Sequence, residues 1–386
     1  MHSLKLILSN FKYFSIVWVF ASINILIGTW VLYIPYVKEK LNLSDAELGI
    51  ALFFFALGIL IFLPVIPFIT KKIGVGNYTF IGIILFSISF TLPLMAPSYG
   101  ILCISLFIVG IFSGSTDVAM NALVSEIEKS DSNNFMSAAH GFFSLGGVIG
   151  GILGSILISF LIDPVWHMVF IASIIILSNI FLAKQYMSIK EEKLLERDTK
   201  FRINKFKPLF GLALIAVSIM ICEGAIEHWS NLYLIEVVHV SSLSLAAIGF
   251  IVFSSTMTLG RFFGDNISEK IGSTKTVLYG CLLAIFGYLL ILAGSFIIAI
   301  VGFGVLGIGL SVIIPELFRV AGKTKGISSS ASISFVSGIG FIGLLIGPVL
   351  LGLISDYANL KVSFSFLLFL VVMVLFISLF KLKNDK

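Results

Sequence analysis

The sequence predicts an all-α membrane protein with twelve transmembrane helices, and two observations support this fold class. Of the 386 residues, 58% are hydrophobic and 12% are charged, whereas a soluble domain carries about twice that share of charge. Apolar runs long enough to cross ~30 Å of hydrocarbon also recur along the whole chain. The expected spans are 13–36, 48–70, 77–96, 100–125, 137–161, 165–184, 208–237, 245–264, 276–294, 296–318, 328–354 and 362–380.

The basic residues indicate how these spans are oriented. An even number of spans places both termini on one side of the membrane. If that side is the cytoplasm, it holds all 25 lysine and arginine residues except Lys38, Lys40 and Lys361. This asymmetry predicts a multi-pass protein of the cytoplasmic (inner) membrane with both termini in the cytoplasm. Because the basic residues lie in short loops, the pI near 9.0 does not indicate a nucleic-acid partner.

The longest connection, residues 185–207, carries many charges of both signs and separates six spans from six. The predicted organisation is an N-terminal six-helix bundle (1–184), a cytoplasmic interdomain linker (185–207) and a C-terminal six-helix bundle (208–386). The linker is expected to be amphipathic or partly disordered at the membrane surface, or else a plain solvated tether.

The two halves resemble each other in sequence. LSDAELG (43–49) matches LSLAAIG (243–249), and FFSLGGVIGGILG (142–154) matches FVSGIGFIGLLIG (335–347). Span 1 therefore corresponds to span 7, and span 5 to span 11. This order predicts parallel repeats, that is, two bundles related by an axis along the membrane normal. The glycines of spans 5 and 11 are expected to let helices approach closely.

Six plus six spans, parallel repeats and a charged central loop resemble the major facilitator superfamily. GRFFGDNISEKIG (260–272) resembles its Gly-Asp-basic signature loop, whereas the first-half counterpart (62–74) lacks the acidic residue and the first glycine. DVAMNALVSEIE (117–128), HGFFSLGG (140–147) and EGAIEHWSNLYL (223–234) resemble the branch of MosC-like and YbjJ-like bacterial proteins related to sugar permeases.

The resemblance implies a cytoplasmic gate at the ends of spans 8 and 10. There, an inter-helix salt-bridge latch would hold the outward-facing state, and the alternative is ordinary charge at helix ends. The residues assigned to this gate are Arg261, Asp265, Glu316 and Arg319.

Span 7 carries the main candidate site. Glu223, Glu227 and Asn231 recur every fourth residue, so they line one helical face. Ionised carboxylates in a span cost about 2.5–3.5 kcal/mol and normally face a water-filled path. Two carboxylates one turn apart repel each other, so one is expected to hold an exchangeable proton; the alternative is a structural pair satisfied by neighbouring helices. His228 is either a partner or a packed histidine, and Trp229 either stacks on a sugar ring or packs as an interfacial or core aromatic.

Spans 1, 4 and 5 supply the other polar candidates. Asp117 and Asn121 repeat the every-fourth-residue pattern in span 4, and His140 enters span 5 at a comparable depth. A cluster of these three residues would either release protons or act as a hydrogen-bond clamp. Asn24 of span 1 either touches solute or joins helices.

Together these features predict a secondary transporter that moves a small polar solute by alternating access, coupled to protons. The sugar- or polyol-like solute class comes from the resemblance alone. The alternatives are a proton-antiport exporter of drugs or metabolites and a non-transporting membrane sensor or scaffold. The sequence has no GxxxxGK[ST] loop and no catalytic triad, so neither ATP drive nor enzyme activity is expected. The expected partners are the solute, protons and the lipid bilayer, with no cofactor or metal, and the chain is expected to be monomeric.

Overall fold

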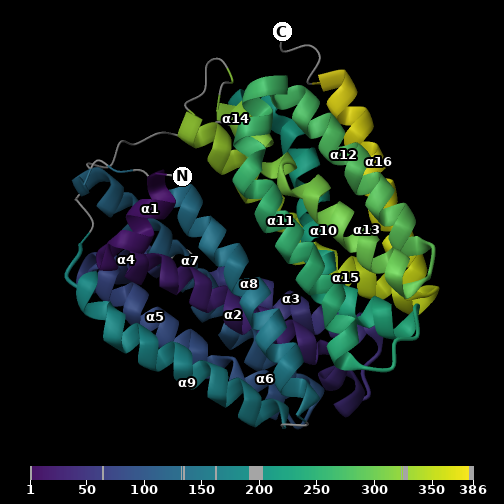
Figure 1. Ribbon diagram of the computed structural model, residues 1–386, viewed down its shortest axis with the longest axis horizontal. Helices are drawn as coiled ribbons and strands as arrows, with labels where there is room; N and C mark the ends of the chain where they lie inside the picture. Colours follow the sequence, from purple (N-terminus) through teal and green to yellow (C-terminus); the bar gives the residue numbers. More distant parts are fainter. Residues whose placement is uncertain are drawn as a thin grey trace. The chain divides into compact units, whose positions relative to one another are not determined.

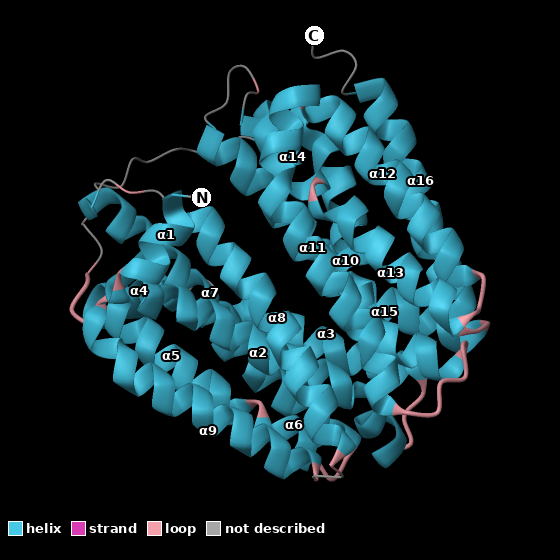
Figure 2. Ribbon diagram, viewed as in Figure 1, coloured by secondary structure: helices cyan, strands magenta, loops and turns pink. Residues whose placement is uncertain are grey.

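The computed structural model describes residues 2–62, 65–131, 133, 135–160, 163–190, 203–322, 324 and 329–381. All regular structure in these residues is helical, and none of them forms a β-strand (Figure 2). Twelve helical segments are long and apolar enough to cross a membrane, which confirms the predicted fold class.

Among the described residues, the first half of the chain forms the α-helices α1–α9 (Figure 1) and the short 3-10 helix η2. Their bounds are α1 His2–Ser9, α2 Phe11–Lys40, α3 Asp45–Phe62, α4 Ile66–Ile73, α5 Val75–Ser89, α6 Thr91–Met95, α7 Tyr99–Asp131, α8 Met136–Ser159, α9 Pro164–Leu182 and η2 Ala183–Gln185.

The second half begins with a 3-10 helix and continues with seven α-helices. Their bounds are η3 Ile203–Leu209, α10 Phe210–Glu236, α11 Leu243–Ile271, α12 Ser273–Leu292, α13 Phe296–Ser311, α14 Ile313–Gly322, α15 Ser329–Tyr357 and α16 Leu360–Lys381.

Two spans are divided by proline. Helix α5 ends at Ser89 and helix α13 ends at Ser311, four residues before Pro93 and Pro315, respectively. Proline has no N–H to donate to the carbonyl four residues back, and its ring clashes with that carbonyl. The expected third and tenth spans are therefore each built from two helices, α5 with α6 and α13 with α14.

The second span is shorter than predicted. We expected residues 48–70 to cross the membrane, but the spanning helix α3 ends at Phe62 and a separate helix, α4, begins at Ile66. Helix α4 has a proline in its first turn, a position where the missing N–H costs nothing. Lys71 and Lys72 lie in its last turn, so α4 is a short amphipathic segment rather than the end of a span.

The chain folds as two compact units, and each has its own core. Unit 1 comprises Met1–Leu43 and Ile50–Leu195, and unit 2 comprises Ser44–Gly49 and Glu196–Lys386. The Ser44–Gly49 segment, which we expected in the first bundle, groups with unit 2. There the Asp45 N–H donates to Asp356 Oδ1 at 2.8 Å, and the Asp45 carboxylate accepts a hydrogen bond from Ser355.

Glycines allow one pair of helices in each unit to pack backbone against backbone. In unit 1, a Cβ added at Gly146 or Gly150 of α8 would lie 2.2 or 2.3 Å from a carbonyl oxygen of α2. In unit 2, a Cβ added at Gly343 of α15 would lie 2.4 Å from the Val217 carbonyl oxygen of α10. Only glycine permits this approach at these positions. The α2–α8 and α10–α15 pairs thus occupy the places expected for spans 1 and 5 and spans 7 and 11.

Candidate functional site

The carboxylate of Glu223 on α10 lies beside the guanidinium of Arg261 on the neighbouring helix α11. Glu223 Oε2 is 3.5 Å from Arg261 Nη2, and the two side chains are 20% and 32% exposed. The second oxygen, Glu223 Oε1, is buried and accepts no hydrogen bond from the residues that the structure describes. The carboxylate is therefore held by one long ion pair, and its other oxygen is available to carry a proton.

Glu227 and His228 follow one turn further along α10. Glu227 is half-buried and lies close enough to Glu223 for their charges to repel. The ring of His228 is half-buried, and its Nδ1 donates to the Gly224 carbonyl oxygen at 2.8 Å. One nitrogen of this histidine is therefore engaged by its own helix.

The polar face of α10 ends at these residues, and the next candidates lie in the interior of unit 2. Asn231 is 1% exposed and Trp229 is 0% exposed. An α-helix advances ~100° per residue, so two steps of four residues rotate Asn231 by ~80° from the direction of Glu223. The expected stripe therefore turns into the bundle core at Asn231. The indole of Trp229 has no open face on which a sugar ring could stack, and it packs as a core aromatic.

The four residues expected at the gate fall into two groups. Arg261 pairs with Glu223, so it joins the expected gate to the expected proton site. Glu316 is 2% exposed and pairs at 3.2 Å with Arg319 on the same helix, α14. Arg319 also donates to Ser268 Oγ of α11 at 2.7 Å, so it ties α14 to α11. Asp265 lies in α11, and its side chain is outside the part of the structure that is described.

In unit 1, Asp117 and Asn121 are one turn apart on α7. The Asn121 amide donates to the Asp117 backbone carbonyl at 2.9 Å, and both side chains are half-buried. His140 on α8 is exposed, and its ring packs edge-on against Phe20 of α2 with centroids 5.4 Å apart. The first two members of the expected cluster thus lie together on one helix, while His140 packs against α2.

Asn24 joins two helices. Its side-chain amide donates to the Phe143 carbonyl oxygen of α8 at 2.9 Å, and the residue is 8% exposed. A Cβ added at Gly147 would lie 2.8 Å from the Asn24 amide nitrogen. The asparagine therefore fills the space that glycine leaves on α8, which favours the helix-joining interpretation.

Three polar contacts between distant residues of unit 1 were missed from the sequence. Tyr33 of α2 hydrogen-bonds Nδ1 of the buried His167 on α9. Lys12 of α2 binds Asp131 of α7 at 2.7 Å, and Tyr13 donates to the same carboxylate at 2.8 Å. Each contact joins residues more than 100 positions apart, so no local pattern could have revealed it.

The described residues contain no group of three or more His, Cys, Asp or Glu side chains that could hold a metal ion. Cys103, Cys222 and Cys281 are all buried and free. The geometry of unit 2 instead offers two acids, one arginine and a histidine around adjoining turns of α10 and α11. Such a set can bind and release a proton and exchange one ion-pair partner for another.

Twelve helices long and apolar enough to cross a membrane, two units with matching glycine-packed helix pairs and an ion pair between two of these helices are typical of polytopic helical transporters. The family model described as Major Facilitator Superfamily matches residues 13–332. The chain therefore belongs to the major facilitator superfamily, whose members carry small solutes across membranes and do not catalyse reactions.

Similar proteins agree with this assignment. The chain is 27% identical over 338 residues to an uncharacterised MFS-type transporter of Yersinia pestis, covering 87% of each chain. It is 26% identical over 360 residues to the membrane protein MosC of Rhizobium meliloti, covering 92% of this chain and 87% of MosC. Among solved structures, the nucleoside transporter NupG matches with a TM-score of 0.76 at 12% identity, covering 97% of this chain and 99% of NupG.

Proposed function

We propose that this superfamily member is a proton-coupled secondary transporter of a small polar solute. The observation that supports the proposal is the Glu223–Arg261 pair, in which an intramembrane carboxylate has one oxygen 3.5 Å from a cation and the other buried without a partner. Such residues in spans are rare and generally mark ion or substrate paths. The sugar- or polyol-like solute class rests on the resemblance of the sequence to its family branch.

In this proposal, protonation of Glu223 controls the contact between α10 and α11. When Glu223 is ionised, it attracts Arg261 and holds α10 to α11. When Glu223 takes up a proton, that attraction disappears, and the guanidinium is free to find another acceptor. A ligand can shift a conformational equilibrium only through different interactions with its two states. Proton binding at Glu223 supplies such a difference, because it decides whether Arg261 is held.

Glu227 would share a proton with Glu223, so that the two carboxylates are not both ionised. Two carboxylates one turn apart share protons as a coupled pair. A proton can therefore pass between Glu223 and Glu227 without leaving the protein. In the proposed alternating-access cycle, the two bundles rock about the solute, and the shared proton loads from one side of the membrane and leaves to the other.

The distribution of lysine and arginine supports a cytoplasmic-membrane location with both termini in the cytoplasm. The few basic residues that fall on the opposite side are near helix ends, as Lys38 and Lys40 are in the last turn of α2. This orientation would place the α11–α14 contact, made by Arg319 and Ser268, at the cytoplasmic ends of these helices. There it would act as part of the gate, as the signature loop implies.

The test uses the full chain in liposomes that contain a pH-sensitive dye. Sugars, inositols and drugs are added in turn, and the direction of the dye response separates symport from antiport. We expect a solute-evoked proton signal that the Glu223→Gln/Glu227→Gln double variant loses. Glu236→Gln is the matched control, because Glu236 is an exposed acid at the end of the same helix. A signal that survives in the double variant would overturn the proposal.

A further inference from the structure

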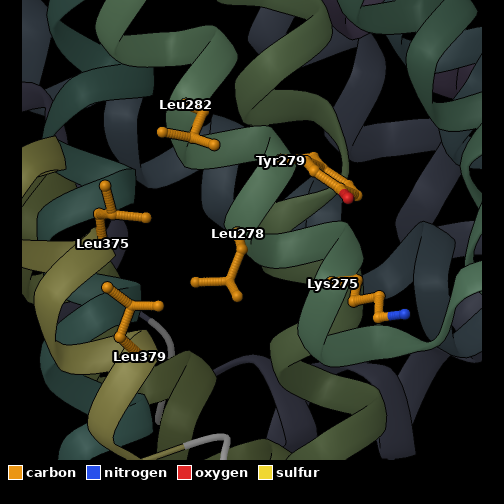
Figure 3. Close-up of a pocket in the computed structure, with 6 residues that line it drawn as sticks. All are labelled: Lys275, Leu278, Tyr279, Leu282, Leu375 and Leu379. Carbon is orange, nitrogen blue, oxygen red and sulfur yellow. The ribbon is translucent and has the colours of Figure 1, made fainter.

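A groove on unit 2 lies between α12 and α16 (Figure 3). Its volume is about 320 Å³. Figure 3 shows Leu278 and Leu282 of α12 facing Leu375 and Leu379 of α16 across the gap. Lys275 and Tyr279 of α12 complete the lining. The floor of the groove is therefore aliphatic, with polar groups from one helix only.

The polar and apolar residues of the groove lie at different depths along α12. Lys275 is in the first turn of α12, and Leu282 lies two turns deeper. At ~1.5 Å per residue, these two positions are ~10 Å apart along the helix. One leaflet contributes ~15 Å of the ~30 Å hydrocarbon core. The groove thus runs from the level of the lipid headgroups through most of one leaflet.

The two polar residues suit a membrane interface. Lys275 is exposed and forms no ion pair with any residue that the structure describes, and Tyr279 is 56% exposed. Tyrosine rings collect at the interface because they have an apolar body and a polar tip. A lysine at the same level extends its ammonium group toward the headgroups. Basic pockets between spans on the cytoplasmic side are suited to anionic headgroups.

We propose that the α12–α16 groove binds an anionic glycerophospholipid, with one acyl chain against the four leucines and the phosphate on Lys275. A second protein is a poorer fit, because a stable protein interface buries more than about 1,000 Å², and this groove has six lining residues. The assignment to the cytoplasmic leaflet rests on the orientation proposed above. The binding itself does not depend on transport.

The test is native mass spectrometry of the full-length chain in detergent, titrated with phosphatidylglycerol and with phosphatidylcholine of the same acyl chains. We expect phosphatidylglycerol to bind more tightly. Lys275→Gln should weaken phosphatidylglycerol binding by about fivefold, the effect of one lysine near an anionic headgroup, and leave phosphatidylcholine unchanged. Lys270→Gln is the control, because Lys270 is an exposed lysine in the last turn of the adjoining helix α11 and does not line the groove.

A second pair of variants tests the apolar wall. Leu278→Trp should fill the groove and weaken binding of both lipids, whereas Leu283→Trp should not, since Leu283 is an exposed leucine of the same helix outside the groove. The proposal is wrong if Lys275→Gln and Lys270→Gln have equal effects, or if both lipids bind the unaltered chain equally well. Transport assays are not involved, so failure here would leave the proposed transport function untouched.

Discussion

Asn24 in unit 1 and Glu223 in unit 2 lie on corresponding spans of the repeat but are chemically different. Asn24 precedes the buried Trp30 by the same number of residues as Glu223 precedes the buried Trp229. Asn24 donates its amide to the backbone of α8, whereas Glu223 presents a carboxylate to Arg261 of α11. One scaffold thus supports an uncharged helix-joining contact in unit 1 and an ionisable contact in unit 2.

This difference suggests that the two units have different roles. Unit 1 uses its position for a hydrogen bond that does not respond to protons. Unit 2 uses the corresponding span for an ion pair, which protonation of the Glu223 carboxylate would weaken. We infer that unit 2 carries the proton and that unit 1 mainly contributes shape and polar contacts. The following predictions are arranged to break or sharpen that inference.

The largest stability effect is expected where helix backbones pack most closely. Gly150→Leu should destabilise the protein by about 3 kcal/mol or more, because overpacking a tight site forces backbone shifts. A Cβ at Gly150 already meets the Ile25 carbonyl oxygen at 2.3 Å. In unit 2 the glycine row is as tight at Gly343, where the nearest atom would be 2.4 Å away, but more open at Gly347, where it would be 3.5 Å away. Gly347→Ala should therefore cost less than about 0.5 kcal/mol. Thermal unfolding in detergent measures both, and equal losses would show that closeness of backbone packing does not decide the cost at these two positions.

The ion pair of unit 2 gives the next effect. Arg261→Gln should cost about 1–3 kcal/mol, because it leaves the Glu223 carboxylate without its cation; partial exposure of both groups keeps the loss below that of a fully buried pair. The double variant Glu223→Gln/Arg261→Gln should recover most of the loss. Comparison of the single and double variants by thermal unfolding gives the interaction energy between Glu223 and Arg261. Additive losses in the double variant would show that the two side chains do not interact.

Two buried tyrosines, one in each unit, allow the units to be compared at hydrogen bonds of the uncharged tyrosine hydroxyl. Tyr33 hydrogen-bonds His167 in unit 1, and Tyr233 donates to the Ile291 carbonyl oxygen in unit 2 at 3.1 Å. Each Tyr→Phe change removes one hydrogen bond and should cost about 1 kcal/mol. Unfolding titrations in denaturing detergent can resolve such a loss. A loss only at Tyr233 would mean that the Tyr33–His167 contact adds nothing to stability.

The smallest effect concerns the start of the first spanning helix in each unit, α2 and α10. In unit 1, Lys12 holds Asp131, and its hydrogen bond lowers the pKa of that carboxylate. The stability from this contact is present above the ordinary aspartate pKa of about 3.9. It disappears as the pH falls through the lowered value, because the protonated carboxyl no longer holds the lysine. In unit 2, the start of α10 is held by Phe335, whose ring packs edge-on against Phe210 with centroids 5.5 Å apart.

Acid should therefore loosen unit 1 and not unit 2 at these positions. Because the pair is partly exposed, the loss should be below about 1 kcal/mol. Hydrogen–deuterium exchange at acidic and neutral pH measures it, with residues near Lys12 compared against those near Phe210. Asp131→Asn should remove the pH effect in unit 1, and equal loosening in both units would contradict this account.

Most of the fold could be predicted from the sequence, because the thickness of the bilayer sets the length of each span and the charge of the loops indicates their side. Spans 1 and 7 and their glycine-rich partners were placed correctly from apolar runs and the internal repeat. The breaks before Pro93 and Pro315 were missed, because an apolar run looks the same whether the helix stops before a proline or continues through it, as α2 does at Pro35. The end of α3 at Phe62 was misplaced for the same reason: hydropathy does not report where a helix stops.

The site was less predictable. The acids of α10 could be identified because charge in a span is costly. Their environment could not be identified, since the Glu223–Arg261 contact depends on how α10 and α11 pack. The every-fourth-residue pattern also predicted a polar face that extends to Asn231. In the structure the face ends earlier, because the rotation of the helix buries Asn231. The Tyr33–His167 pair gave no signal, since a single histidine or tyrosine in a span resembles any other buried aromatic.

The most direct test of the central claim separates solute exchange from proton-driven accumulation in one variant. With a transported solute in liposomes, Glu223→Gln should keep exchange of labelled for unlabelled solute. It should lose accumulation driven by a proton gradient by about 10²-fold, the typical contribution of a positioned proton-transfer group. Asn24→Ala, on the corresponding span of unit 1, should slow both processes to a similar extent. Undiminished proton-driven accumulation by Glu223→Gln would contradict the assignment of the proton to Glu223.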